Sequence, residues 1–336
     1  MRAVQISHYS KQIHTHLRQL PVPEPSPTQV LVRICAAAVN PLDLLLLSGS
    51  LRLLWKTPLP LTLGNECAGV VERVGPEVTR FRAGDRVYAR LPLERIGAFA
   101  EYAAVDQDAL ARIPAGYSFR QAAAIPLTGL TAYQGITEEL QARPGQTLLI
   151  PGGSGSFGQM AVPIARELGL RVIVTGNSRA REGILALGAE RYLDYRQENY
   201  WEVLSGVDHV IDTLGPKEFE RELSVLKPGG RLLSLRTGPN RAFGESHSLP
   251  GWQKALFTLA GARYDRAARR QGKEYRFLFV RADGAQLETI TRMVERRQIL
   301  PPVDPHRFGL EQAEEALNLV AHGPTSGKVI LDLEEE

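Results

Sequence analysis

The feature that most constrains the fold of this chain is a glycine-rich turn between an apolar run and a helical pattern. The apolar run is Leu148–Pro151, and the amphipathic segment Gln159–Leu168 follows the turn. The turn's glycines have the spacing G-x-G-x-x-G, which lets the backbone approach a pyrophosphate closely at the N-terminus of a helix. Such a turn can also be a simple connection, but the strand before it and a second strand after the helix favour dinucleotide binding. We therefore expect cofactor contacts from Gly153, Ser154, Gly155, Ser156, Phe157 and Gly158.

Strand-like runs alternate with helical patterns on both sides of this turn, which predicts an α/β fold with a doubly wound parallel sheet. The expected strands are Leu148–Pro151, Val172–Thr175, Tyr192–Asp194, His209–Asp212, Arg231–Leu235 and Tyr275–Val280. The first part of the chain instead carries many short strands separated by Gly and Pro, as barrel-like or sandwich-like domains do. We expect residues 1–122 and 283–336 to form this β-rich domain, and residues 123–282 to form the nucleotide-binding domain.

Composition gives no indication of a nucleic-acid or membrane partner. The net charge is only +3, and 43% of the residues are hydrophobic. The two cysteines provide no disulfide framework and no C-x-x-C pattern. The most apolar run, Leu42–Trp55, is interrupted by Asp43, Gly49 and Arg52, and is too short to cross a bilayer. With no secretory signal pattern at the start, these properties predict a cytoplasmic protein.

The segment after the second strand of the nucleotide-binding domain indicates which cofactor is bound. NAD-binding proteins carry an acidic residue there for the ribose 2′-OH, but the segment Thr175–Arg181 has no carboxylate. Its side chains can donate to a 2′-phosphate instead, because arginine pairs well with phosphate. The alternative is that the arginines are only solvated residues at a helix start. We predict NADPH, with contacts from Asn177, Ser178, Arg179 and Arg181.

Several motifs along nearly the whole chain resemble the zinc-independent, quinone-oxidoreductase-like branch of the medium-chain dehydrogenase/reductase superfamily. They are Ala36–Asp43, Leu63–Val71, Phe81–Tyr88, Gly97–Tyr102, Ala122–Ala132, the glycine turn, Val210–Gly215, Lys227–Arg231 and Gly327–Leu331. The resemblance implies a GroES-like barrel domain beside a Rossmann domain. It also implies NADPH-dependent reduction of a quinone or α,β-unsaturated carbonyl compound by a homodimer.

The resemblance also assigns individual residues. It places Asn40 near the nicotinamide ribose and Thr131 near the carboxamide, as catalytic residues. The other cofactor contacts that it implies are Gly215, Tyr195 near the adenosine 2′-phosphate, and Lys328 near the phosphate or nicotinamide end. Asn40 could instead be a turn residue before Pro41, and Lys328 could simply begin an edge strand. Leu45 stands where better-studied relatives often have a tyrosine.

The same resemblance indicates whether the chain has the ligands of a catalytic zinc ion. Zinc-dependent relatives bind a catalytic zinc with a cysteine, a histidine and a second cysteine, and the matching positions here are Asn40, Asn65 and Leu127. Glu66 alone cannot form a zinc site. The seven histidines have no ligand spacing, and most of them are expected at the surface or in loops. We therefore expect no metal.

Two segments near the end of the nucleotide-binding domain leave alternatives open. On a helix, four basic residues would form one stripe: Arg263, Arg266, Arg270 and Lys273. A solvated face is the favoured interpretation, and a lid or a nucleic-acid contact is the other. The apolar run Tyr275–Val280 is a candidate for the dimer edge, or for an interior strand.

Two other functions also remain possible at this point. The chain could be an NADPH-binding protein with a structural or RNA-binding role, since a fold can outlive its activity. It could also be a metal-independent alcohol dehydrogenase.

Overall fold

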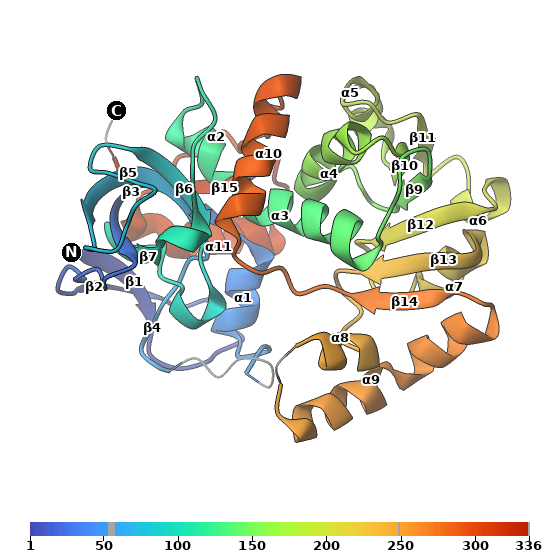
Figure 1. Ribbon diagram of the computed structural model, residues 1–336, viewed down its shortest axis with the longest axis horizontal. Coiled ribbons are helices and arrows are strands. Elements are labelled where there is room, and N and C mark those ends of the chain that lie inside the picture. Colours follow the sequence, from blue (N-terminus) through green and yellow to red (C-terminus); the bar gives the residue numbers. More distant parts are fainter. Residues whose placement is uncertain (53–57, 248, 335–336) are drawn as a thin grey trace. The chain divides into compact units, whose positions relative to one another are not determined.

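The computed structural model describes residues 1–52, 58–247 and 249–334, and the chain divides into two compact units (Figure 1). Unit 1 comprises Met1–Leu130 and Arg281–Glu336, and unit 2 comprises Thr131–Val280. The first boundary falls inside helix α3 (Pro126–Gln134), a few residues later than the expected division at 122. Helix α2 (Phe119–Ala123) packs against strands of unit 1, so the chain leaves that unit only after it.

Unit 2 is built on a six-stranded sheet with the order β11-β10-β9-β12-β13-β14 (Figure 1). Neighbouring strands pair in parallel, and the order reverses direction between β9 and β12, as in doubly wound folds. The strands are β9 (Thr147–Ile150), β10 (Arg171–Gly176), β11 (Arg191–Asp194), β12 (Val207–Asp212), β13 (Leu226–Ser234) and β14 (Glu274–Phe277). The Rossmann-type sheet predicted from the sequence is thus confirmed.

The helices of unit 2 alternate with these strands along the chain. They are α4 (Ser156–Glu167), α5 (Arg181–Ala186), α6 (Tyr200–Val203), α7 (Phe219–Val225), α8 (Arg241–Ser246) and α9 (Gly251–Arg270), with shorter turns η3 (Gly135–Glu139) and η4 (Ser178–Ala180). Figure 1 shows α8 and α9 next to β14, and both helices contact that strand. The rings of Phe219 and Tyr264 lie 4.8 Å apart and those of Tyr264 and Tyr275 lie 5.3 Å apart, which ties α7, α9 and β14 into one aromatic core.

Unit 1 is the β-rich part of the chain. A six-stranded sheet has the order β15-β3-β5-β6-β8, with β7 also paired to β3, and a three-stranded sheet has the order β2-β1-β4. The strands are β1 (Arg2–Ile6), β2 (His16–Gln19), β3 (Gln29–Val39), β4 (Leu61–Thr62), β5 (Glu66–Val74), β6 (Arg86–Arg90), β7 (Tyr102–Asp106), β8 (Leu110–Arg112) and β15 (Val329–Asp332). Pairings in both sheets are antiparallel, and the GroES-like class predicted for this unit is confirmed.

Few helices accompany these strands. They are α1 (Pro41–Leu47), α2, α10 (Gly284–Arg297) and α11 (Ala313–His322), with 3₁₀ turns η1 (Leu93–Arg95), η2 (Gln107–Ala109) and η5 (Leu310–Gln312). The apolar run expected from Leu42 to Trp55 begins as α1, and its residues 53–55 lie outside the described residues. No helix in the described ranges is long and apolar enough to cross a membrane.

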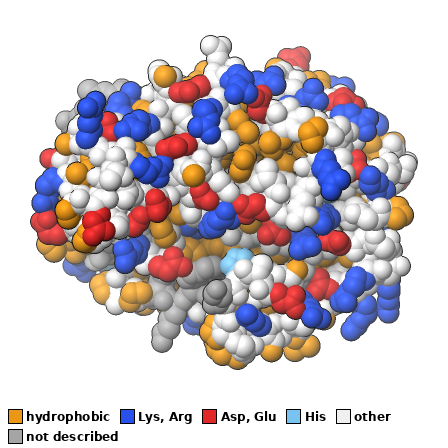
Figure 2. Space-filling model, viewed as in Figure 1, with side chains coloured by type: hydrophobic (Ala, Val, Ile, Leu, Met, Phe, Trp, Pro, Cys, Tyr) orange, Lys and Arg blue, Asp and Glu red, His pale blue; other side chains and the backbone are white. Residues whose placement is uncertain are grey.

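The last strand, β15, lies at one end of the strand order of the six-stranded sheet and brings a distant part of the sequence to β3. Strand β15 pairs antiparallel with β3, and Val329 lies opposite Val39. In this register the residue before β15, Lys328, meets the residue after β3, Asn40. Charged side chains of both signs are interspersed over the face seen in Figure 2, in keeping with the small net charge.

Candidate functional site

The glycine turn of unit 2 has the geometry that its spacing predicts. A Cβ at Gly158 would lie 1.8 Å from the Gly153 carbonyl oxygen, so only glycine lets α4 pack this close to the turn. A Cβ at Gly153 would lie 2.8 Å from Ile150 Cγ2. At Gly155, the residue before α4, a Cβ would meet no atom within 4 Å. Two glycines thus close the turn, and the third faces open space beside the helix N-terminus, where a pyrophosphate fits.

Threonines from neighbouring strands, which the sequence interpretation missed, hold this turn in place. Gly152, with φ of +68°, donates its N–H to Thr175 Oγ1 at 3.1 Å. Thr213 Oγ1 donates to the carbonyl of Pro151 at 2.7 Å. Thr175 is the next-to-last residue of β10, and Thr213 directly follows β12. A hydroxyl at the carboxyl end of a parallel strand is the signal that could have found them.

The predicted cofactor residue Gly215 lies in a second turn, after β12. Its φ is +97°, and its N–H donates to Asp212 Oδ1 at 2.7 Å. The same oxygen accepts from Leu214 N at 2.7 Å, and Asp212 Oδ2 accepts from the Ser234 hydroxyl at 2.6 Å. Asp212 is buried, so this carboxylate fixes the shape of the turn.

The ends of β10 and β11 bring together the residues expected at the 2′-phosphate. Tyr195 N donates to Gly176 O at 3.2 Å, and the Tyr195 ring is 56% exposed. Within the described residues, the buried Asn177 Oδ1 has no hydrogen-bond partner, which leaves an acceptor for a ligand. Ser178 and Arg179 are exposed at the same edge. Asn177, Ser178, Arg179 and Tyr195 thus all follow β10 or β11 at the ends of these strands.

Two other residues predicted to contact the cofactor, Arg181 and Thr131, lie outside the two turns and the strand ends described above. Arg181 is exposed, and its Nη1 lies 3.4 Å from the carbonyl of Tyr192, a weak contact that holds it along β11. Thr131 is half-buried in α3 and is the first residue of unit 2.

Unit 1 contains a buried polar cluster around Glu66. The Lys328 ammonium donates to Asn40 Oδ1 at 2.6 Å and lies 2.9 Å from Glu66 Oε1. Asn40 Nδ2 donates to the same Glu66 oxygen at 2.9 Å and to Ala38 O at 3.1 Å. Glu66 Oε2 accepts from Leu127 N at 2.6 Å. Asn40, Glu66 and Lys328 are all buried, so the pair is held in a medium of low dielectric constant.

These contacts define the orientation of the Asn40 amide. The ammonium can only donate, so the side-chain oxygen of Asn40 faces Lys328 and its NH₂ group faces Glu66. Both amide hydrogens of Asn40 are therefore used within unit 1. Lys328 has three N–H donors, of which Asn40 and Glu66 account for two.

Asp43 lies beneath this cluster, at the start of α1. It accepts from Asn40 N at 2.8 Å and from Asn65 Nδ2 at 3.0 Å. Complete burial raises the pKa of Asp43 to about 7, although the hydrogen bonds from Asn40 and Asn65 oppose the shift. Asp43 thereby fixes the backbone of Asn40 and the side chain of Asn65, two of the positions where zinc-dependent relatives carry ligands.

Arg90 is a further buried charge on the same sheet. It lies opposite Glu66 in the register of β5 and β6, so the two side chains are on the same face. Its Nη1 donates to Leu91 O at 2.6 Å, while its Nε and Nη2 are buried without a partner among the described residues. Burial lowers the pKa of Arg90 to about 10, and the carboxylates of Glu94 and Glu66 oppose this shift. Sequence interpretation did not single out Arg90, which ends a strand whose middle, Val87–Ala89, is buried and which begins with another arginine.

Two histidines of unit 1, His14 and His16, lie in contact, with their ring centroids 4.7 Å apart. No three His, Cys, Asp or Glu side chains in the described residues are grouped so as to hold a metal ion. His209 differs from the surface position expected for most histidines. It is buried in β12, 3.0 Å from Gln146 Oε1, and burial lowers its pKa to about 4. Between Asn40 and Glu66 the cation is the ammonium of Lys328.

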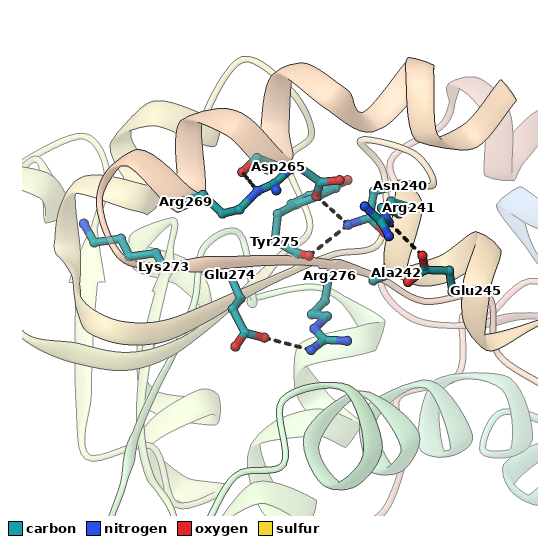
Figure 3. A pocket seen from close by; sticks show the side chains of 10 residues that line it. All are labelled: Asn240, Arg241, Ala242, Glu245, Asp265, Arg269, Lys273, Glu274, Tyr275 and Arg276. Carbon is teal, nitrogen blue, oxygen red and sulfur yellow. Dashed lines mark hydrogen bonds and ion pairs between the residues drawn. The ribbon is translucent and has the colours of Figure 1, made fainter. Parts of the chain in front are cut away.

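A hollow of about 250 Å³ lies elsewhere in unit 2, between α8, α9 and β14 (Figure 3). Its polar side chains are largely bonded to one another. Asn240 Nδ2 donates to Asp265 Oδ1 at 2.7 Å, and Arg241 pairs with Glu245 at 2.7 Å. It contains none of the predicted site residues.

Known proteins match this chain over nearly its whole length, and they belong to the family that its motifs resemble. Residues 26–115 match the alcohol dehydrogenase GroES-like domain family, and residues 187–331 match the zinc-binding dehydrogenase family. The chain is 29% identical over 348 residues to the quinone oxidoreductase of Homo sapiens, covering 98% of this chain and 97% of that protein. It is 30% identical over 319 residues to the 2-methylene-furan-3-one reductase of Solanum lycopersicum, covering 92% and 73%. The solved structure of the quinone oxidoreductase from Coxiella burnetii superposes with a TM-score of 0.83 at 26% identity, covering 99% of each chain.

Proposed function

Because the chain belongs to the quinone-oxidoreductase-like branch of the medium-chain dehydrogenase/reductase superfamily, we propose that it is an NADPH-dependent reductase of quinones or α,β-unsaturated carbonyl compounds. The relatives named above are an oxidoreductase for quinones and a reductase for a methylene furanone, whose names support these two acceptor classes. The observation that carries the proposal is the buried ammonium of Lys328 between Asn40 and Glu66. It supplies a fixed cation without a metal.

Residues of unit 2 would bind the cofactor. The turn from Gly153 to Gly158 would hold the pyrophosphate through backbone N–H groups at the start of α4. Ser178 and Arg179 would bind the 2′-phosphate, with Tyr195 beside the adenosine. Arg181, Gly215 and Thr131 would complete the site as the family resemblance implies. When bound, the nicotinamide supplies the hydride.

Residues of unit 1 would bind and orient the acceptor molecule. Asn40 and Glu66 hold the Lys328 ammonium in one orientation, and the third N–H of Lys328 can donate to the nicotinamide end or to an acceptor oxygen. One hydrogen bond stabilises developing negative charge less than a metal ion does. Quinones and enals delocalise that charge over their own conjugated atoms, so they suit such a site, whereas simple ketones do not. Water supplies the proton that completes the reduction.

The functional assembly that we propose is a homodimer joined through β14. This strand is at the edge of the unit 2 sheet and, in the described part of the chain, pairs only with β13. It ends at Phe277, so the expected run to Val280 is only partly a strand. The Tyr275 carbonyl already accepts from Asn240 Nδ2 at 3.0 Å, and the remaining backbone groups at this edge would pair with a second copy. Light scattering at micromolar concentration tests this, and a monomer mass would contradict it.

The test of the chemistry is NADPH oxidation with three acceptor classes: small quinones, 2-alkenals and simple ketones. We expect turnover with the first two, tighter binding of NADPH than of NADH, and unchanged activity after chelator treatment. Lys328→Met should lower kcat/KM at least about tenfold, because one charge-assisted hydrogen bond is lost. The matched control is Lys11→Met, since Lys11 is exposed in the same unit. NADPH binding without turnover would favour a non-catalytic role, and robust alcohol oxidation would favour an alcohol dehydrogenase.

A further inference from the structure

Helix α9 in unit 2 carries an exposed stripe that the proposed chemistry does not use. Three large apolar side chains lie on it at spacings of four and three residues: Trp252 is 59% exposed, Leu256 37% and Leu259 77%. The stripe continues at the same spacing with Arg263, Arg266 and Arg270, all exposed. Residues spaced in this way share one side of a helix.

The helix is anchored by its other side, so this stripe faces away from the core of unit 2. The buried residues of α9 are Gln253, Phe257, Gly261, Tyr264 and Ala268. The sequence had placed Lys273 on the basic stripe, but the helix ends at Arg270 and Gly272 has φ of +66°. Lys273 therefore turns inward and donates to Leu223 O at 2.5 Å.

The basic half of the stripe borders a hollow of about 420 Å³. It is lined by Ala262, Arg266, Arg269 and Arg270. Within the described residues, neither Arg266 nor Arg270 is in an ion pair, and the one carboxylate of α9, Asp265, accepts from Asn240. Three guanidinium groups around one hollow are suited to bind phosphate groups. Figure 2 shows hydrophobic side chains along the lower edge, where Figure 1 places the first half of α9.

We propose that α9 is a docking surface for an anionic phospholipid membrane. Its first half would insert Trp252, Leu256 and Leu259 among the acyl chains near the surface, and its arginines would bind the lipid phosphates. Trp, Leu and Arg are the residue types that helices use in the membrane interface, and here the apolar and basic groups follow one another along one side of α9. The proposal concerns attachment to the surface, and it is independent of the reaction that the protein catalyses.

Two other occupants fit the stripe less well. A nucleic acid would pair with the arginines but would leave the three large apolar side chains in water, and Tyr264 is turned into the core instead of toward bases. A second copy joined by a two-fold axis through α9 would place arginines against arginines, or arginines against the apolar half, depending on direction. Only a surface with anionic groups above an apolar layer complements both halves.

The test is co-sedimentation of the full chain with vesicles of phosphatidylcholine alone and of phosphatidylcholine mixed with phosphatidylglycerol. We expect binding to the mixed vesicles that weakens with added salt. Arg266→Gln combined with Arg270→Gln should lower partitioning roughly 30-fold, since each arginine near an anionic surface contributes about a factor of five. Leu259→Gln should lower it about tenfold or more. Arg171→Gln and Leu300→Gln, at exposed positions outside α9, are the matched controls and should bind normally.

Fluorescence provides a second readout that does not depend on sedimentation. Insertion of Trp252 should shift the emission of the protein to shorter wavelength on adding mixed vesicles, and Trp252→Phe should abolish the shift. Equal binding to both vesicle types, or unchanged binding of the α9 variants, would overturn the proposal. The proposal would also be overturned if the protein bound inorganic phosphate or an oligonucleotide but no vesicles. The same holds if the only effect of Leu259→Gln were a change of oligomeric state.

Discussion

The buried pair between Lys328 and Glu66 allows a quantitative test of how unit 1 is held together. The perturbation is Lys328→Met, which keeps the aliphatic length but removes the ammonium. It leaves the Glu66 carboxylate, which is completely buried, with two neutral donors, Asn40 Nδ2 at 2.9 Å and Leu127 N at 2.6 Å. Breaking a buried ion pair costs about 3–5 kcal/mol, and the two remaining donors place this case near the lower end, about 3 kcal/mol.

A second substitution separates the charge effect from the loss of packing. Glu66→Gln in the Lys328→Met background removes the unpaired charge while retaining an amide that can accept from Leu127 N. The double variant should therefore regain about 2 kcal/mol relative to Lys328→Met alone, a positive coupling between neighbouring residues. Urea-induced unfolding followed by circular dichroism measures the four free energies of the cycle: wild type, Lys328→Met, Glu66→Gln and the double variant. Strictly additive effects, or a Lys328→Met variant as stable as the wild type, would refute the reasoning.

Three further perturbations test other buried groups and the glycine turn. Burial raises the pKa of Asp43 to about 7 from an ordinary 3.8, so the native state keeps a proton that the unfolded chain has lost. The free energy of unfolding should fall by up to about 4 kcal/mol as the pH rises from 4 to 7, and Asp43→Asn should remove that slope in pH-dependent urea titrations. Burial raises the pKa of Glu222 to about 10, so at pH 7.5 Glu222→Gln should stabilise unit 2 by up to about 4 kcal/mol, measured by thermal unfolding; a loss of stability would contradict this. Gly158→Ala, whose Cβ would lie 1.8 Å from Gly153 O, should lower stability and abolish NADPH binding, whereas Gly155→Ala should weaken only binding, as calorimetric titration of both variants would show.

The parts of the molecule that depend on local sequence could be predicted well. The glycine turn is specified by residues within one short segment, and a Cβ at Gly158 cannot fit for reasons that the G-x-G-x-x-G spacing already implies. Strands β9 and β12 of unit 2 are buried along nearly their whole length, which shows that both faces of the sheet are covered there. Parallel strands covered in this way tend to be rich in apolar residues, and this made them recognisable in the sequence. Local steric rules and burial therefore account for the fold of this unit.

The polar cluster of unit 1 could not be predicted in the same way, because it depends on the register of distant strands. Lys328 and Asn40 are 288 residues apart in the sequence. Only the antiparallel pairing of β15 with β3, with Val329 opposite Val39, brings them together. From the sequence, Lys328 was expected near the phosphate or the nicotinamide end of the cofactor, or simply at the start of an edge strand. In the structure it directly precedes the edge strand β15 and contacts Asn40.

The surface of α9 shows a different limit of sequence interpretation. A net charge of +3 over the whole chain gave no reason to expect a membrane partner. The four arginines in the second half of α9 are concentrated on one short segment, and acidic residues elsewhere balance them in the sum. The exposure of Leu259, an apolar residue in a helical pattern that would normally be assigned to a core, becomes visible only when the buried side of the helix is known.

The pairing of β15 with β3 also means that the cation of the candidate site, Lys328, comes from the residue just before the last strand. A metal-dependent site is completed by an ion that can dissociate, whereas Lys328 is fixed by the strand that immediately follows it. Glu66 and Asn40 lie in the first part of the chain, and until β15 pairs with β3 their buried polar atoms lack the ammonium that neutralises them. An unpaired buried carboxylate is strongly unfavourable. We therefore expect β15 to pair with β3 in the same folding step in which Lys328 reaches Glu66. The ammonium of Lys328 is therefore held as firmly as the fold of unit 1. Any substitution that loosens β15 should lower stability and, under the proposed function, activity as well.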